Sequence, residues 1–373
     1  MSTSALFTPI RIKDVGFANR IVVSPMCQYS AEAGCATDWH LMHLGMLSNS
    51  GAGLLFVEAT AVEPEGRISA RDLGLYDDAT EAALARVVSA CRRYGTAGLA
   101  IQIGHAGRKA SVREPWRGGG PLGPEEGAWQ PLAPSAIPFA EGWPAPRAFG
   151  PDDFERVRRA FVLTAERALR LGFDMLEVHA AHGYLLHAFL SPVSNIREDA
   201  YGGSRENRMR FPLEVFEAVR AAWPAGRPLG VRITGSDWIE GGWTVEDALA
   251  FGQALKQRGC DFLDVSSGGI APKADIRIGP GYQVPFAAEI RRRTGLPTMA
   301  VGLIVTPEQA ERIVADGDAD MVALARAVLD DPHWGWHAAR ALGAEIAYPP
   351  QYERAAPRVW PGHAWRDDAS AMD

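Results

Sequence analysis

The sequence of 373 residues lacks the features that mark nucleic-acid-binding, membrane and exported proteins. Its formal net charge is −7 and no run of Lys and Arg stands out, so we expect no nucleic-acid partner. Its apolar runs are far shorter than the ~20 residues of a membrane-spanning helix, so we expect no membrane association. The N-terminus, Met1 to Asp14, has neither the basic nor the apolar region of a signal peptide, which predicts a cytoplasmic protein.

Cysteine is also scarce. The four cysteines lie far apart and form no C-x-x-C pair; they are Cys27, Cys35, Cys91 and Cys260. Such spacing argues against a disulfide framework, an iron–sulfur cluster and a structural zinc site. We therefore expect a reducing compartment and no bound metal.

Hydrophobic residues make up 47% of the chain, enough for a large core, and many are grouped in short continuous runs. Such runs are typical of strands that are covered on both faces. They occupy residues 20–26, 53–59, 99–105, 175–178, 229–234, 262–267, 298–302 and 321–325. Helical patterns with recognisable ends separate many of them, at 79–94, 151–171, 244–259 and 306–317. Thr306-Pro-Glu-Gln309 predicts a capping box.

This alternation predicts an α/β fold, a single (β/α)8 TIM barrel domain over residues 1–373. A doubly wound open sheet is the alternative, but it needs a G-x-G-x-x-G turn where this chain has Ser24-Pro-Met-Cys27. Residues 6–19 predict a short N-terminal hairpin, and 345–373 form a C-terminal tail. Residues 107–150 are a long loop insertion after the third strand. It is either a lid or pocket wall, or an inert excursion.

Chemistry in such a barrel gathers at the C-terminal ends of the strands. His179, His182 and Tyr184 directly follow the run 175–178. Two imidazoles and a phenol can polarise an oxygen and deliver a proton. The alternative is that they are half-buried loop residues whose polar atoms bind backbone groups.

Residues after the seventh and eighth strands indicate an anion site. Gly302, and the pair Ala325-Arg326, stand where phosphate commonly binds in this fold. Glycine permits close backbone approach, and the guanidinium fork can grip phosphate oxygens. The alternative is a plain turn at Gly302 and a salt bridge at Arg326.

Polar residues at other strand ends indicate a site that binds a flat polar heterocycle. Gln102 offers the donor and acceptor that the pyrimidine edge of a flavin requires. Arg232 lies inside an apolar run and needs an anionic partner, either a reduced flavin or a carboxylate such as Glu58. Cys27 is either a small buried hydrophobe or a polarisable sulfur that tunes a flavin's redox potential.

Several segments together resemble the Old Yellow Enzyme family of flavin-dependent ene-reductases. They are Arg20-Ile-Val-Val-Ser-Pro-Met-Cys-Gln-Tyr29, Val57-Glu-Ala-Thr-Ala-Val62, Ile101-Gln-Ile-Gly-His-Ala-Gly-Arg-Lys109, His179-Ala-Ala-His-Gly-Tyr-Leu185, Leu190-Ser-Pro192, Asp199-Ala-Tyr-Gly-Gly-Ser204, Glu206-Asn-Arg208 and Arg326. The likeness is to the xenobiotic reductase, or thermophilic-like, subclass with a short N-terminal cysteine motif. It covers residues 6 to about 352.

The resemblance implies one FMN-binding barrel. FMN would be bound by Ser24, Pro25, Met26, Cys27, Ala59, Gln102 and Arg232, and at its phosphate by Gly302, Ala325 and Arg326. His179 and His182 would hold the substrate's carbonyl oxygen, Tyr184 would donate the proton, and Tyr29 would line the substrate face. Many relatives have glycine at the position of Ala325, but alanine keeps the backbone N–H.

The resemblance also implies partners. NADPH would be the hydride donor, with NADH as a second candidate, and the substrates would be small activated alkenes. A homodimer or homotetramer would place a C-terminal arginine, matched here by Arg354, in a neighbour's site. Trp360 is a further candidate, and the alternative for both is a solvated tail.

Two readings from other classes compete with this one. A metal-dependent hydrolase would use histidines of the same barrel, namely His40, His43, His105, His179 and His182. No H-x-H ends the first strand and no acidic residue ends the eighth, which disfavours it. A non-catalytic binding barrel leaves the histidines and tyrosine without a role. His187 lies one helical turn beyond Gly183-Tyr184 and is interpreted as a packing residue.

Overall fold

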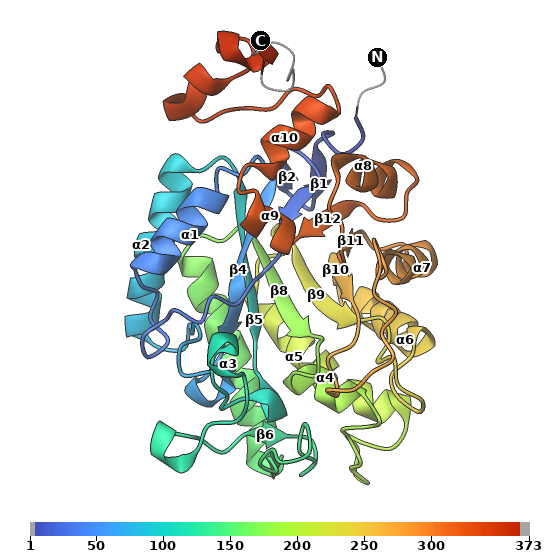
Figure 1. The fold of residues 1–373 in the computed structure, drawn as a ribbon. Helices are drawn as coiled ribbons and strands as arrows, with labels where there is room; N and C mark the ends of the chain where they lie inside the picture. Colours follow the sequence, from blue (N-terminus) through green and yellow to red (C-terminus); the bar gives the residue numbers. More distant parts are fainter. Residues whose placement is uncertain (1–3, 366–373) are drawn as a thin grey trace.

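The computed structural model describes residues 4–365 and contains a closed barrel of eight parallel strands, which confirms the predicted fold (Figure 1). Hydrogen bonding between β12 and β3 closes the ring. The barrel strands are β3 (Ile21–Val23), β4 (Leu54–Ala61), β5 (Gly98–Gly104), β8 (Met175–Ala180), β9 (Leu229–Thr234), β10 (Phe262–Ser266), β11 (Thr298–Ala300) and β12 (Met321–Leu324). All eight predicted runs thus contain a strand.

Helices connect the strands and cover the outside of the barrel (Figure 1). They are α1 (Asp38–Leu47), α2 (Asp78–Tyr94), α3 (Pro151–Arg170), α4 (Leu185–Leu190), α5 (Arg205–Ala222), α6 (Val245–Gln257), α7 (Val284–Thr294), α8 (Pro307–Ala315), α9 (Arg326–Asp330) and α10 (Trp334–Ala341). In α3, Val157 and Phe161 are buried at helical spacing, and Gly172 follows the helix with a φ of +85°. The four predicted helices are therefore present.

The capping box predicted at 306–309 is only half formed. Thr306 accepts the backbone N–H of Gln309, as expected for an N-cap residue. The side-chain oxygen of Gln309 accepts from the N–H of Val305 at 3.0 Å, one residue before the N-cap. The reason is local, since the side chain of Gln309 also donates to the carbonyl of Leu303 at 3.1 Å and so spans the turn before the helix.

The N-terminal end of the barrel is closed by the predicted hairpin. Its strands are β1 (Ile10–Ile12) and β2 (Val15–Phe17), and they pair antiparallel around a turn at Lys13-Asp14. Ile12 and Phe17 are buried in one apolar cluster with inward residues of the strands, among them Phe56 and Met175. Because apolar side chains fill this end, polar chemistry is left to the opposite end of the barrel.

The insertion and the tail lie at opposite ends of the molecule (Figure 1). The insertion contains short elements, which are η2 (Gly107–Lys109), η3 (Pro115–Arg117), η4 (Pro124–Glu126), β6 (Leu132–Ala133) and β7 (Arg147–Ala148). It lies with α4 at the C-terminal end of the barrel strands. The tail carries η5 (Pro350–Ala355) and η6 (Pro361–Trp365), and it exposes both Arg354 and Trp360. Among residues 4–365, no helix is long and apolar enough to cross a membrane.

Candidate active site

The loop after β8 carries the predicted histidines and tyrosine. His179 is the penultimate residue of β8, and Tyr184 is the N-cap residue of α4. Between them the backbone is left-handed, with φ of +59° at His182 and +75° at Gly183. The N–H of Leu185 donates to the carbonyl of His105 at 2.9 Å, which ties the loop to the end of β5. The structure thus brings all three candidate side chains to one edge.

Ring nitrogens of the two histidines converge on one point. His179 Nδ1 accepts the N–H of Ala181 at 3.2 Å, which leaves His179 Nε2 protonated. That Nε2 lies 3.3 Å from His182 Nδ1. His182 Nε2 lies 2.7 Å from Ser266 Oγ, which also lies 3.5 Å from the carbonyl oxygen of Ile233. The hydroxyl can donate to His182, which puts the ring proton on Nδ1, or to Ile233, which puts it on Nε2. Without substrate, His179 Nε2 can donate to His182 Nδ1. An oxygen within reach of both nitrogens can accept from both when the ring proton of His182 is on Nδ1 and Ser266 donates to Nε2.

Burial sets the protonation of these groups. Burial, reinforced by the charge of Arg232, lowers the pKa of His179 and of His182 well below the ordinary value, so both rings are neutral. Burial raises the pKa of Tyr184 well above its ordinary value, and the phenol keeps its proton. The tyrosine ring stands edge-on to that of His179, with centroids 5.0 Å apart. The loop therefore presents uncharged N–H donors beside one O–H.

Lys109, which the sequence reasoning did not select, braces the loop. Its Nζ donates to the carbonyl of His182 at 2.8 Å and to that of Gly269 at 3.1 Å. It also lies 5.0 Å from the centre of the Tyr184 ring. Burial, together with Arg108, lowers the pKa of Lys109 to about 8. A cation thus holds the carbonyl between the two catalytic candidates.

A polar network lies deeper in the barrel. Gln102 and Glu177 are register partners on β5 and β8, and Gln102 Nε2 donates to Glu177 Oε1 at 2.7 Å. Arg232 and Asp264 are register partners on β9 and β10, with Nε and Oδ2 3.3 Å apart. Arg232 also donates to Ser24 Oγ at 3.3 Å. Two buried carboxyl groups therefore lie near one buried cation, and Asp264 is the one paired with it.

Glu58 is not the partner of Arg232, so that part of the prediction is wrong. Glu58 lies on β4, three strands away from β9 around the barrel, and faces His40 instead, with Oε1 and Nε2 3.1 Å apart. The physical reason is register, because Asp264 stands directly across the ladder from Arg232. The expectation that Arg232 needs an anion was sound, but the neighbouring strand supplies one.

The network also has unused hydrogen-bonding capacity. Among residues 4–365, Arg232 Nε, Asp264 Oδ1 and Glu177 Oε2 are buried without a hydrogen-bond partner. Such atoms are costly unless something polar binds them. Together with Gln102 they provide donors and acceptors for the edge of a flat polar heterocycle, so these residues fit a flavin ring.

The segment after β3 forms another side of the mouth. Ser24 is buried, Pro25, Met26 and Cys27 are half-buried, and the N–H of Ser24 donates to the carbonyl of Leu324 on β12. Burial, followed by the charges of Asp72 and Glu58, raises the pKa of Cys27 well above its ordinary value. Its sulfur is therefore a neutral thiol.

Glu58 anchors the next part of this segment. Its Oε2 accepts the N–H of Gln28 at 2.9 Å, and Tyr29 follows with a φ of +49°. The ring of Tyr29 meets Trp116 of the insertion edge-on, with centroids 5.7 Å apart. This contact favours the interpretation of the insertion as a pocket wall.

The remaining FMN candidates lie on the same rim. Gly302 has a φ of +116°, and a Cβ there would lie 2.7 Å from Gln283 Nε2, so the turn requires glycine. Ala325 precedes α9 and is half-buried, while Arg326 is exposed. Because β11 pairs with β12, these turns are adjacent.

Ala59 occupies an irregularity in β4. The register between β4 and β5 shifts between Val57 and Thr60, which is the mark of a β-bulge. A bulge re-aims the backbone at a strand's end, and it leaves Ala59 half-exposed where its neighbours are buried.

Three other histidines have both ring nitrogens engaged, which disfavours the hydrolase alternative. Each accepts a backbone N–H at Nδ1 and faces a carboxylate with Nε2. The pairs are His40 with Thr37 N and Glu58, His105 with Gly107 N and Glu63, and His187 with Gly183 N and Asp237. Within the described part of the chain, no group of three or more His, Cys, Asp and Glu residues is arranged to hold a metal ion.

His187 is not a simple packing residue, contrary to the prediction. It is fully buried, but both of its ring nitrogens contact polar groups. Helical spacing placed it off the catalytic face and could not show that Nδ1 accepts the N–H of Gly183, four residues earlier in the chain.

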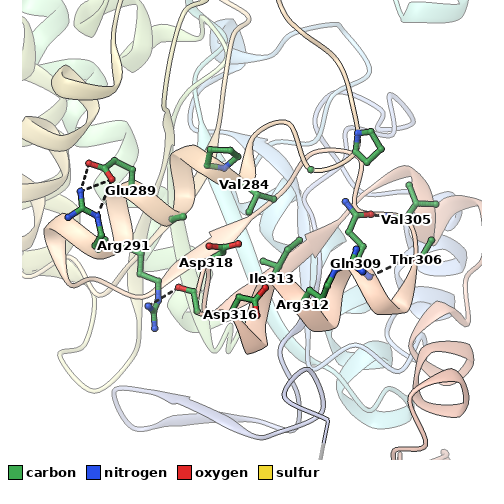
Figure 2. A pocket seen from close by; sticks show the side chains of 16 residues that line it. Val284, Glu289, Arg291, Val305, Thr306, Gln309, Arg312, Ile313, Asp316 and Asp318 are labelled. Carbon is green, nitrogen blue, oxygen red and sulfur yellow. Dashed lines mark hydrogen bonds and ion pairs between the residues drawn. The ribbon is translucent and has the colours of Figure 1, made fainter.

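A wide groove of about 1050 Å³ lies outside the barrel between α7 and α8 (Figure 2). Two of its arginines are already paired, Arg291 with Asp320 at 2.8 Å and Arg292 with Glu289 at 2.7 Å. The groove gathers none of the side chains described at the strand ends, so we place the chemistry there.

Sequence reasoning missed Glu177, Asp264, Lys109 and Trp116. A signal existed for two of them, since Glu177 and Asp264 interrupt apolar runs in the same way as Arg232. Lys109 and Trp116 belong to the aperiodic insertion, where no pattern indicates which side chains turn back to the barrel.

Comparison with known proteins points to one family. The model of the NADH:flavin oxidoreductase / NADH oxidase family matches residues 5–345. An NADPH dehydrogenase of Geobacillus thermodenitrificans is 46% identical over 353 residues, which cover 94% of this chain and 98% of that protein. An NADPH dehydrogenase of Bacillus licheniformis is also 46% identical, over 95% of this chain and 100% of that protein.

Solved structures agree with the sequence matches. Morphinone reductase is 29% identical, with a TM-score of 0.74, over 94% of this chain and 93% of that one. The old yellow enzyme homologue from Zymomonas mobilis is 26% identical, with a TM-score of 0.75, over 92% of this chain and 94% of that one.

Proposed function

The chain belongs to the NADH:flavin oxidoreductase / NADH oxidase family, a family of FMN oxidoreductases, and we propose on that premise that it is an NADPH-dependent ene-reductase. Its substrates are α,β-unsaturated carbonyl or nitro compounds, which receive a hydride at the β-carbon and a proton at the α-carbon. The observation that carries the proposal is the convergence of His179 Nε2 and His182 Nδ1, 3.3 Å apart, beside the buried phenol of Tyr184.

The residues present fit FMN. The ring would lie against Ser24 to Cys27, Ala59, Gln102 and Arg232, and the unpartnered Nε of Arg232 suits its heteroatoms. Gly302, Ala325 and Arg326 would hold the phosphate through backbone N–H groups and a guanidinium. When bound, FMN supplies the two-electron carrier between nicotinamide and alkene.

His179 and His182 hold the oxygen of the activating group. Both rings are neutral, so each offers one N–H without bringing a charge into the site. As the β-carbon gains hydride, negative charge develops on that oxygen. A preorganised donor aimed at developing charge contributes about 10²–10³ in rate.

Tyr184 supplies the proton. Its raised pKa keeps the phenol protonated, and the rings of His179 and Tyr184 are in contact. Tyr29 and Trp116 line the outer side of the substrate space. General acid help of this kind contributes about 10²–10⁴ in rate.

The test replaces Tyr184 by Phe and separates the half-reactions. Tyr184→Phe should slow reoxidation of the reduced flavin by cyclohexenone about 10²–10⁴-fold. Reduction of the flavin by NADPH should remain nearly unchanged, because that step needs no acid. Tyr94→Phe, an exposed tyrosine at the end of α2, is the matched control. Equal losses in both half-reactions would show that Tyr184 is not the acid.

NADPH is proposed as the donor because the relatives in two genera are named NADPH dehydrogenases. No residue of the sequence was assigned to a 2′-phosphate, so NADH is the second candidate. Stopped-flow reduction by each nicotinamide, at equal concentrations, distinguishes them. A faster rate with NADH would reverse the choice.

We propose further that the protein is a homodimer or homotetramer in which Arg354 serves a neighbour's site. Arg354 is exposed in η5. The C-terminal tail that carries η5 lies at the end of the molecule opposite α4 (Figure 1). Helix α1 also exposes an apolar stripe of Trp39, Met42 and Met46. Light scattering gives the oligomeric state, and Arg354→Ala should raise KM in an oligomer. A monomer with unchanged KM would contradict both parts.

The cytoplasm is the compartment we propose. All four cysteines are free thiols, which suits a reducing environment. Fractionation of the source cells would test this location, and activity recovered outside the cytoplasmic fraction would contradict it.

A further inference from the structure

Behind the catalytic loop lies a fully buried pair, His187 on α4 and Asp237 after β9. His187 Nε2 is 3.1 Å from Asp237 Oδ1, and both side chains have no exposure. The contact is bent, but neither atom has another hydrogen-bond partner among residues 4–365. The other carboxylate oxygen accepts from Ser191 Oγ at 2.6 Å and from the N–H of Trp243 at 2.8 Å. Asp237 is thus held by groups other than His187.

The backbone determines the tautomer of His187. Its Nδ1 accepts the N–H of Gly183 at 2.8 Å, so Nδ1 carries a lone pair. The ring proton of the neutral imidazole is then on Nε2, facing the carboxylate. Asp237 is an acceptor there, since its Oδ1 has no proton to give while its pKa is low. Burial opposes ionisation, but His187, Ser191 and Trp243 hold the pKa of Asp237 below its ordinary value.

The N–H that His187 holds belongs to an unusual turn. Gly183 and His182 both have positive φ, a conformation that a non-glycine residue such as His182 seldom adopts. Other bonds fix the preceding residue, because the N–H of His182 donates to Thr234 Oγ1 at 3.2 Å and its carbonyl accepts from Lys109. The bond from the Gly183 N–H to His187 holds the other side of the same peptide, between His182 and Gly183, and Tyr184 is the next residue.

We propose that Asp237 and His187 are positioning residues: the carboxylate selects the imidazole tautomer that holds the Gly183 N–H, and this bond aims His182 and Tyr184. The inference rests on the function proposed above for those two side chains. Neither His187 nor Asp237 touches the substrate. A displacement of about 1 Å at a reacting group can cost 10²-fold in rate, so a shift of this turn is sufficient to impair catalysis.

Asp237→Asn is the decisive substitution. The amide oxygen can still accept from Ser191 and Trp243, which turns the NH2 toward His187. The ring must then accept at Nε2 and carry its proton on Nδ1, where it opposes the N–H of Gly183. A wrong tautomer held in place by an isosteric amide is a known way to lose catalysis without losing the fold.

The holoenzyme provides a kinetic comparison with a matched control. Asp237→Asn should slow reoxidation by cyclohexenone about 10²-fold, while flavin content stays the same. Ser191→Ala removes one hydrogen bond from the same carboxylate without changing the tautomer, so it should leave the rate unchanged. Equal rates in the two variants, whether slow or fast, would overturn the proposal.

A rescue variant separates positioning from packing. His187→Asn places an amide oxygen where Nδ1 of the histidine lies. That oxygen can accept the N–H of Gly183 whether residue 237 is Asp or Asn. His187→Asn/Asp237→Asn should therefore be faster than Asp237→Asn alone. A double variant that is as slow as Asp237→Asn, or that no longer binds flavin, would contradict the role assigned to the Gly183 bond.

Nitrogen-15 NMR of histidine-labelled holoenzyme gives a readout that does not depend on substrate. Wild type should show His187 protonated at Nε2 only, and Asp237→Asn should invert this and shift the ring signals of His182. A protonated Nδ1 in wild type, or an unmoved His182, would refute the positioning role. If the NMR changes appear but wild type does not reduce any enone, the proposed function fails instead, and the two failures remain distinct.

Discussion

Glu177 offers a direct test of how charge is distributed inside the barrel. Its side chain is fully buried, and burial, followed by the nearby charge of Asp264, raises its pKa well above the ordinary value. Arg232 is 3.3 Å from Asp264, so these two form the ion pair. Glu177 is then a neutral acid whose Oε1 accepts from Gln102 at 2.7 Å.

Glu177→Gln should therefore be tolerated. The amide keeps the accepting oxygen, and it replaces a hydroxyl by an NH2 of similar size. We expect the free energy of unfolding at pH 7 to change by less than about 1 kcal/mol. Asp264→Asn is the contrasting variant, since it leaves Arg232 buried without its counter-charge. That substitution should cost about 3–5 kcal/mol.

The pH dependence gives the magnitude and its sign. Folding raises the pKa of Glu177, so between the unfolded and folded values the folded state holds a proton that the unfolded state has released. The stabilising contribution is complete below the unfolded pKa of about 4.3 and is lost as pH rises toward the folded value, by about 1.4 kcal/mol per pH unit. Over the pH range in which the folded acid keeps its proton, wild type should lose stability relative to Glu177→Gln as pH rises.

Urea unfolding at pH 5, 6 and 7, with FMN at a fixed excess, measures this difference. Wild type and variant differ in one titrating group, so subtraction of the two free energies gives the titration of Glu177 together with its effect on Asp264. Parallel pH curves for the two proteins would show that Glu177 is ionised in the folded state and would refute the reasoning.

Three further predictions concern the mouth of the barrel. Cys27→Ala should leave FMN bound but change its redox potential, which spectroelectrochemistry measures. The change should be independent of pH from 6 to 8, because the raised pKa keeps Cys27 a neutral thiol. An unchanged potential would make Cys27 a packing residue. Gly183→Ala should destabilise the fold by at least about 1–3 kcal/mol in chemical unfolding, since φ is +75° and the Cβ would lie 2.2 Å from the carbonyl oxygen of Gly269. Trp116→Ala should raise KM for bulky cyclic enones without changing kcat, since Trp116 is 68% exposed and its ring meets Tyr29; an unaltered KM would make the insertion inert.

The sequence was sufficient to predict the barrel because its strands are covered on both faces and their helices have distinct ends. The strand bounds were less accurate, and β4 shows why. The predicted run stops at Ala59, but the strand continues to Ala61 because a bulge between Val57 and Thr60 lets the ladder resume. A bulge depends on pairing with the neighbouring strand, and a run of apolar residues does not encode it.

Partners across the barrel were harder to predict than the residues themselves. Arg232 was recognised as a buried charge, but the choice of Glu58 as its candidate carboxylate ignored that consecutive strands of such a barrel are neighbours. The adjacent run contains Asp264, and strand order alone would have favoured it. The exact opposition of Asp264 and Arg232 still depends on register, which follows from side-chain packing and is set by no short motif.

The histidines show the same limit in chemical terms. Residue type and position selected His179 and His182 as a pair and set His187 aside, but they could not show how His40, His105 and His187 differ chemically from that pair. The difference is which ring nitrogens are already bound. In the second group Nδ1 accepts a backbone N–H and Nε2 faces a carboxylate, so no nitrogen is left for a ligand. In the first group the two ring nitrogens lie 3.3 Å apart and, among residues 4–365, contact only each other, so an oxygen placed beside the pair can accept from them. The histidines of the second group hold the loops in place, and those of the first group are available to bind the substrate's oxygen.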